Sequence, residues 1–213
     1  MVKNPKDKRS PGKCFICGKE IAPRTARGHL ESCLDKRKSE GFPTRLFMIK
    51  VEGYGLGNYH YWMYLLMPEE AKLRDLDKFL RKTWLECCGH LSQFYVGRNI
   101  KIPMGKEVGV VLMPSMEILY DYDFGSTTTL KVSVVGVGGG SLGKRKVELL
   151  ARNNAPIPTC ELCGDAATFI CPQRAYEESG WLCEKCLEKH DCGLGAFLPI
   201  VNSPRTGVCG YVG

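Results

Sequence analysis

The sequence contains no long apolar run. Its longest uninterrupted apolar stretch, YWMYLLM at 61–67, is far shorter than the roughly 20 residues that a membrane-spanning helix needs. The opening residues, MVKNPKDKRSPGK, contain no apolar core of the kind found in secretory signals. We therefore expect a cytoplasmic protein with no membrane partner.

An excess of negative charge is also missing. The 213 residues include 30 Lys or Arg and 23 Asp or Glu, and residues 1–45 hold twelve of the basic and five of the acidic ones. Residues 46–213 are therefore neutral in sum, and all of the net charge of +7 belongs to the first 45 residues. Such asymmetry is typical of a contact with a polyanion, and a solvated tail produces the same pattern. The charge predicts DNA or RNA as a partner.

Cysteine, in contrast, is abundant. Twelve cysteines in a chain expected to stay in the cytoplasm favour metal ligands over disulfides. The first group has the spacing C-x2-C-x11-H-x3-C, and a helix that begins after Thr25 would place its last two ligands on one face. We predict a C2HC zinc finger over residues 14–40, preceded by a basic disordered arm over 1–13. Its ligands are Cys14, Cys17, His29 and Cys33.

The same segment carries the basic residues that we expect to contact phosphates. One finger reads only about three base pairs, so binding by a single copy should be weakly sequence-specific. The five residues assigned to nucleic-acid binding are Arg24, Arg27, Lys36, Arg37 and Lys38.

A second cysteine group lies in a predicted Cys-rich module over residues 156–213. Two C-x2-C pairs separated by 19 residues match the four-cysteine zinc spacing, so we expect about two zinc ions per chain. The pairs are Cys160 with Cys163 and Cys183 with Cys186. Four further residues either complete another metal site or, for the cysteines, pack as small hydrophobic side chains: Cys171, His190, Cys192 and Cys209.

Residues 45–155 predict an α+β domain with a mixed or antiparallel sheet and one main helix. Strand-like stretches at 45–53 and 58–67 precede a helical pattern over 70–88. HLSQFYVG, EVGVVLM, MEILYDYDF and TTLKVSVVGV follow as strand-like stretches, the last two as a hairpin, and KVELLAR as a strand or short helix. GGGSLGK at 138–144 matches part of a phosphate loop, but Arg145 replaces the expected Ser or Thr. We interpret it as a hairpin loop and expect no nucleotide cofactor.

The segments GHLSQF and YDYDFG, together with LRDLDKFLRKTWLECC and VELLARNNAPIPTCELCG, resemble the Ri-plasmid open-reading-frame-three-like family. Members of that family also occur as passenger proteins of insertion elements. The resemblance covers roughly residues 45–165. It implies an α+β fold and a link to mobile elements or nucleic acid, and it implies no established reaction.

Catalytic chemistry has few candidates. Asp121 and Asp123 alternate along a predicted strand and could together bind a metal or transfer protons. His90 follows Cys87 and Cys88, as in a Cys/His nucleophile pair, but Cys87 falls on the apolar stripe of the predicted helix and favours core packing. We predict a non-catalytic zinc protein that binds nucleic acid through its N-terminal finger. The alternative is a zinc-finger adaptor for proteins, and the third option is an enzyme with a pocket near Asp121, Asp123 and His90.

Overall fold

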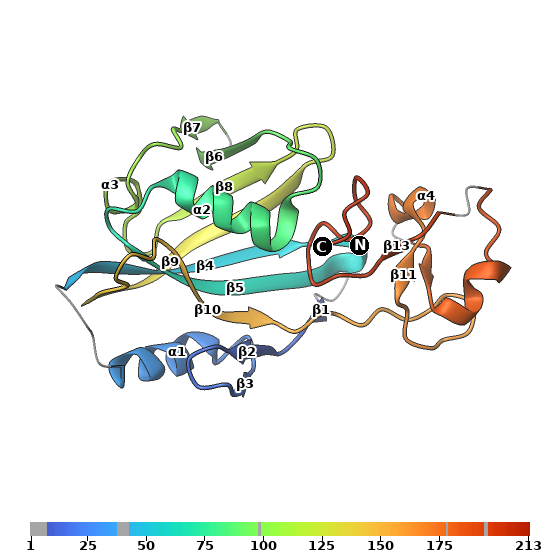
Figure 1. Ribbon diagram of the computed structural model, residues 1–213, viewed down its shortest axis with the longest axis horizontal. Coiled ribbons are helices and arrows are strands. Elements are labelled where there is room, and N and C mark those ends of the chain that lie inside the picture. Colours follow the sequence, from blue (N-terminus) through green and yellow to red (C-terminus); the bar gives the residue numbers. More distant parts are fainter. Residues whose placement is uncertain (1–7, 38–42, 98, 178, 194–195) are drawn as a thin grey trace, which may run out of the picture.

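The computed structural model describes residues 8–37, 43–97, 99–177, 179–193 and 196–213 (Figure 1). One large twisted sheet with few helices dominates it, which confirms an α+β fold. The sheet order is β3–β2–β10–β5–β4–β9–β8–β6–β7, with neighbours antiparallel, and β1 pairs with β5 in parallel. Its strands are β1 (Lys8–Arg9), β2 (Gly12–Cys14), β3 (Glu20–Ile21), β4 (Thr44–Tyr54), β5 (Tyr59–Pro68), β6 (Ser92–Val96), β7 (Ile100–Ile102), β8 (Glu117–Tyr122), β9 (Thr128–Gly140) and β10 (Glu148–Asn153).

The remaining elements are short. A three-stranded sheet of order β12–β11–β13 lies in the C-terminal part of the chain. Its strands are β11 (Phe169–Ile170), β12 (Trp181–Leu182) and β13 (Leu198–Pro199). The helical segments are α1 (Ala26–Asp35), η1 (Leu56–Asn58), α2 (Leu73–Leu80), η2 (Arg81–Leu85), α3 (Val108–Val111), α4 (Pro172–Ala175) and η3 (Glu184–Lys189).

The large sheet is covered on both faces, so β5 is buried along nearly its whole length. Because side chains alternate between the faces of a strand, residues such as Met63 and Leu65 join the core under α2. Their neighbours Trp62 and Leu66 join a second core under α1. Figure 1 shows α2 and α1 on opposite sides of the sheet. The predicted main helix is confirmed as α2, which continues into a π-helical turn at η2.

Two predicted elements are wrong. EVGVVLM forms the single turn α3, because the amides of Val108 and Gly109 donate to Ala71 and Glu69 and not to a neighbouring strand. The glycine-rich stretch is not a hairpin loop: Gly138–Gly140 end β9, and the chain then crosses to β10, which pairs with β5. Most of the KVELLAR stretch lies in β10, the strand to which this connection leads.

The N-terminal cysteine segment is joined to the sheet. We predicted a disordered arm over 1–13. Residues 1–7 of it lie outside the described residues. From Lys8 onward the chain forms β1 and β2. β2 pairs with β10 in the register Ala151↔Cys14. The division into modules at 14–40, 45–155 and 156–213 stays a prediction.

The chain ends on the main domain. After β13 it returns to the β4–β5 end of the large sheet and buries Ser203, Arg205 and Thr206. None of the described helices is long and apolar enough to cross a membrane.

Candidate metal centres

All four residues of the first predicted group come together. Cys14 ends β2, Cys17 lies in the following turn, and His29 and Cys33 lie one helical turn apart on α1. The Nε2 atom of His29 is 3.3 Å from the sulfur of Cys17 and 3.4 Å from that of Cys33. All four ligand atoms lie within 4.8 Å of one another, an arrangement that can hold a metal ion.

The four cysteines of the second group also converge. Cys160, Cys163, Cys183 and Cys186 place their sulfurs within 4.8 Å of one another, and the Cys163 and Cys183 sulfurs are 3.5 Å apart. This group therefore offers four sulfur ligands, whereas the first offers three sulfurs and a nitrogen.

The first C-x2-C turn of each group has the same backbone geometry. In the first, the amide of Gly18 donates to the carbonyl of Cys14 at 2.9 Å, and in the second Gly164 donates to Cys160 at 3.0 Å. Both glycines have positive φ, 77° and 81°, which a residue without a Cβ adopts at little cost. Each turn thus folds back on itself and directs two sulfurs to one point.

Local hydrogen bonds favour the thiolate form at one sulfur of each group. The backbone amide of Lys19 lowers the pKa of Cys17 to about 7. Burial raises the pKa of Cys160, but the amides of Cys183 and Leu162 outweigh it and lower that pKa to about 6. Burial and neighbouring thiols raise the pKa of Cys33 to about 11. A metal that binds at neutral pH would therefore displace protons from the remaining sulfurs.

The predicted extra site forms only in part. Cys171, His190 and Cys192 lie together as three donors, but Cys209 is not among them. The prediction that Cys209 completes this group is wrong, because the C-terminal segment runs back to the large sheet.

Cys209 belongs to a fourth cluster, with Cys87, Cys88 and His90. We predicted core packing for this stretch. Cys87 does pack against the main core, whereas the sulfur of Cys88 is exposed and lies 3.0 Å from Nε2 of His90. Sequence reasoning missed the cluster because Cys209 lies 119 residues beyond His90, and only the closeness of His90 to two cysteines hinted at it.

The two aspartates of the enzyme option do not act as a pair. Asp121 accepts a hydrogen bond from Thr129 at 2.7 Å. Asp123 lies past the end of β8 with φ of 65°, so the strand alternation that would align it with Asp121 is lost. Asp123 is buried and forms an ion pair with the fully buried Arg205.

The basic residues differ in how free they are. Arg24 and Lys36 are exposed and form no ion pair with a described residue. Arg27 forms an ion pair with Glu31 at 2.9 Å, and Nη1 of Arg37 donates to both oxygens of Glu148 at 2.9 Å. Lys38 lies outside the described residues.

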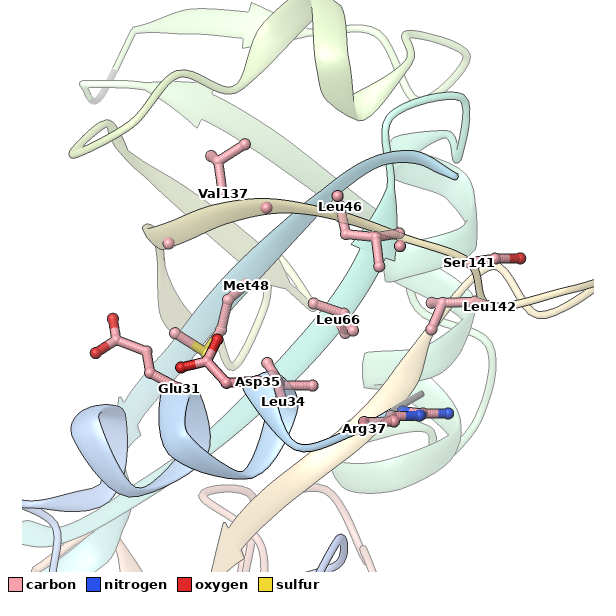
Figure 2. A pocket seen from close by; sticks show the side chains of 14 residues that line it. Glu31, Leu34, Asp35, Arg37, Leu46, Met48, Leu66, Val137, Ser141 and Leu142 are labelled. Atoms are coloured by element: carbon pink, nitrogen blue, oxygen red, sulfur yellow. The ribbon is translucent and has the colours of Figure 1, made fainter. Parts of the chain in front are cut away.

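A pocket of about 400 Å³ lies between α1 and the large sheet, lined also by the glycine-rich end of β9 (Figure 2). Leu46, Met48 and Leu66 provide apolar lining from the sheet, and Glu31 and Asp35 provide carboxylates from α1. Arg37 also lines the pocket, which therefore combines an apolar surface with charges of both signs.

The geometry defines an α+β protein with several cysteine and histidine clusters that can hold metal ions. No family model and no curated protein matches the chain. The fold is similar to the crystal structure of a protein of unknown function from Methanosarcina mazei Go1, with 20% identity and a TM-score of 0.47 over 72% of this chain and 86% of that one.

Proposed function

We propose that this protein is a zinc-binding, non-catalytic protein that binds nucleic acid through its N-terminal module. Thiolate and imidazole ligands in a four-donor set suit Zn²⁺, and a set with no open position is typical of structural sites. The two groups that begin with Cys14 and Cys160 meet this condition. Zinc would fix α1 against the turn after β2.

The observation that supports nucleic acid is the set of exposed basic side chains on α1 and at its two ends. The inner side of this helix packs on the sheet through Ala26 and Leu30, and Arg24, Arg27 and Lys36 remain exposed. Exposed Lys and Arg side chains that neutralise phosphates release counterions, which favours binding. The resemblance to insertion-element proteins supports the same partner.

A protein adaptor is the second candidate, and the pocket under α1 favours it. Its apolar lining with charged residues of both signs would suit an apolar peptide segment better than a polyanion. Arg24, unlike Arg37, does not line the pocket, so substitution of Arg24 can separate the two candidates.

Fluorescence anisotropy with labelled oligonucleotides across a salt series tests the proposal. Two free cations and two that are shared with carboxylates predict a slope of log K against log salt of about −2 to −3.5. Arg24→Ala should reduce the slope by nearly one unit for every sequence. Glu148→Gln should strengthen binding, because it releases Arg37 from its carboxylate partner.

Lys78→Ala is the matched control, since Lys78 is exposed on α2, across the sheet from α1. It should leave both affinity and slope nearly unchanged. Equal binding by the wild type, Arg24→Ala and Glu148→Gln would contradict the nucleic-acid proposal and favour the adaptor.

A further inference from the structure

The last residues of the chain are fastened to the main domain at one place. The guanidinium of Arg205 forms an ion pair with Asp123 and donates to the hydroxyl of Thr128 at 3.0 Å. Four residues later, the sulfur of Cys209 reaches the cluster of Cys88 and His90. The same short segment thus supplies a buried cation to Asp123 and a sulfur to the neighbouring cluster of Cys88 and His90.

The sulfur–sulfur distances in this cluster match those around a tetrahedral zinc ion. Tetrahedral zinc places two sulfurs about 3.8 Å apart and a sulfur and a nitrogen about 3.6 Å apart. The Cys88 sulfur lies 3.7 Å from that of Cys87 and 3.8 Å from that of Cys209. The Nε2 atom of His90 is 3.0 Å and 3.2 Å from the sulfurs of Cys88 and Cys209, shorter than the tetrahedral separation.

Asp123 orients the imidazole of His90 from the Nδ1 side, opposite the sulfurs. Its Nδ1 atom lies 3.4 Å from Oδ1 of Asp123, which is 4% exposed. A carboxylate at Nδ1 holds the proton on that nitrogen and leaves the lone pair of Nε2 directed at the sulfurs, as in many metal sites with histidine ligands. Arg205 and the amide of Gly125 in turn hold Asp123.

Backbone strain marks both sides of the cluster. Cys209 has φ of 50° and Asp123 has φ of 65°, left-handed conformations that residues with a Cβ adopt at a cost. Two such residues bring their side chains to His90 from separate parts of the chain.

We propose that Cys87, Cys88, His90 and Cys209 bind a zinc ion that latches the C-terminal segment to the connection between α2 and β6. This site is separate from the two in the proposed function. Three sulfurs and one nitrogen form a closed ligand set, whereas a Cys/His nucleophile would need a single thiol with room for a substrate. The latch would hold the C-terminal sheet beside β5, where Trp181 contacts Tyr59 with ring centroids 5.9 Å apart.

Native mass spectrometry of the reduced full chain counts the zinc ions bound by the wild type and its variants. Cys209→Ser and His90→Ala should each bind one zinc ion fewer than the wild type. Leu91→Ala is the matched control, because its side chain is 73% exposed beside His90 and should leave the zinc count unchanged. An unchanged count in Cys209→Ser and His90→Ala, or a Cys88–Cys209 disulfide in wild-type protein purified without an oxidant, would overturn the proposal.

A measurement on the wild type alone guards against variants that fail to fold. In protein loaded with ¹¹³Cd, one cadmium resonance should correlate with the Hβ protons of both Cys88 and Cys209. Correlation of cadmium with the other cysteine groups but with neither of these would overturn the proposal. Nucleic-acid binding by Cys209→Ser should equal that of the wild type, so failure of the latch and failure of the proposed function are distinguishable.

Discussion

At the scale of single residues, Glu52 on β4 is a carboxylate surrounded by basic side chains on the sheet face under α1. Its carboxylate lies 2.6 Å from Nζ of Lys50, 3.1 Å from Nε2 of His60 and 3.6 Å from Nζ of Lys131. Burial raises the pKa of Glu52, but the hydrogen bonds from His60 and Lys50 outweigh it and lower that pKa to about 2. The folded state therefore favours the ionised form.

Glu52→Gln should lower the free energy of unfolding at neutral pH by about 2 kcal/mol. Because the folded pKa lies below the unfolded value of about 4.3, this stability is present above about pH 4.5 and is lost as the pH falls toward about 2. Urea unfolding at a series of pH values measures it. The control, Glu117→Gln, removes a carboxylate that is 53% exposed and shares Lys131, and it should change little. Parallel pH curves for the wild type and Glu52→Gln would contradict the prediction.

At the scale of elements, the attachment of β2 to β10 decides whether the first cysteine group belongs to the main fold. Gly12 lies at this junction, and a Cβ there would lie 2.6 Å from the ring of Trp62 and collide with the carbonyl of Arg152. The indole of Trp62 also donates to the carbonyl of Ser10 at 3.1 Å. The close approach of two backbones requires a glycine at this position.

Gly12→Ala should destabilise the protein by about 2 kcal/mol, because β2 must move away from β10. Gly28→Ala is the matched control, since a Cβ at Gly28 on α1 meets nothing within 4 Å and should stabilise the helix by about 1 kcal/mol. Thermal unfolding measures both changes. Equal melting temperatures for the two variants would show that the β2–β10 pairing contributes little.

Much of the element pattern could be predicted from the sequence. The strands β4, β5, β8 and β9 and the helix α2 have strong local periodicity, and each was expected close to its observed position. α3 could not be predicted, because a valine-rich stretch favours a strand until the loop before α2 supplies its hydrogen bonds. The crossover from β9 to β10 depends on pairing between distant strands, which local residue patterns do not reveal.

The candidate sites divide in the same way. Two C-x2-C turns with a following glycine could be recognised because their ligands are close in the sequence. The group around His90 could not, because Cys209 reaches it through the path of the C-terminal segment and Asp123 through the pairing of β6 with β8. Likewise, Arg37 follows the end of α1, and only the fold brings it to Glu148.

At the scale of the whole molecule, the cysteine groups lie where separate segments meet. The first joins β2 to α1 and the group around His90 joins the end of the chain to the main domain, while the second joins two turns beside the small sheet. No disulfide joins any two cysteines in the part of the chain that the structure describes. Our central claim is that zinc ions connect these segments.

Zinc-edge X-ray absorption, combined with elemental analysis of protein purified without added metal, tests this claim most directly. The two predicted modules require two zinc ions per chain, and the C-terminal latch adds a third. The absorption fine structure should show a shell dominated by sulfur at about 2.3 Å, with a minor nitrogen contribution at about 2.0 Å. A metal-free protein with oxidised cysteines, or zinc surrounded mainly by oxygen, would contradict the account.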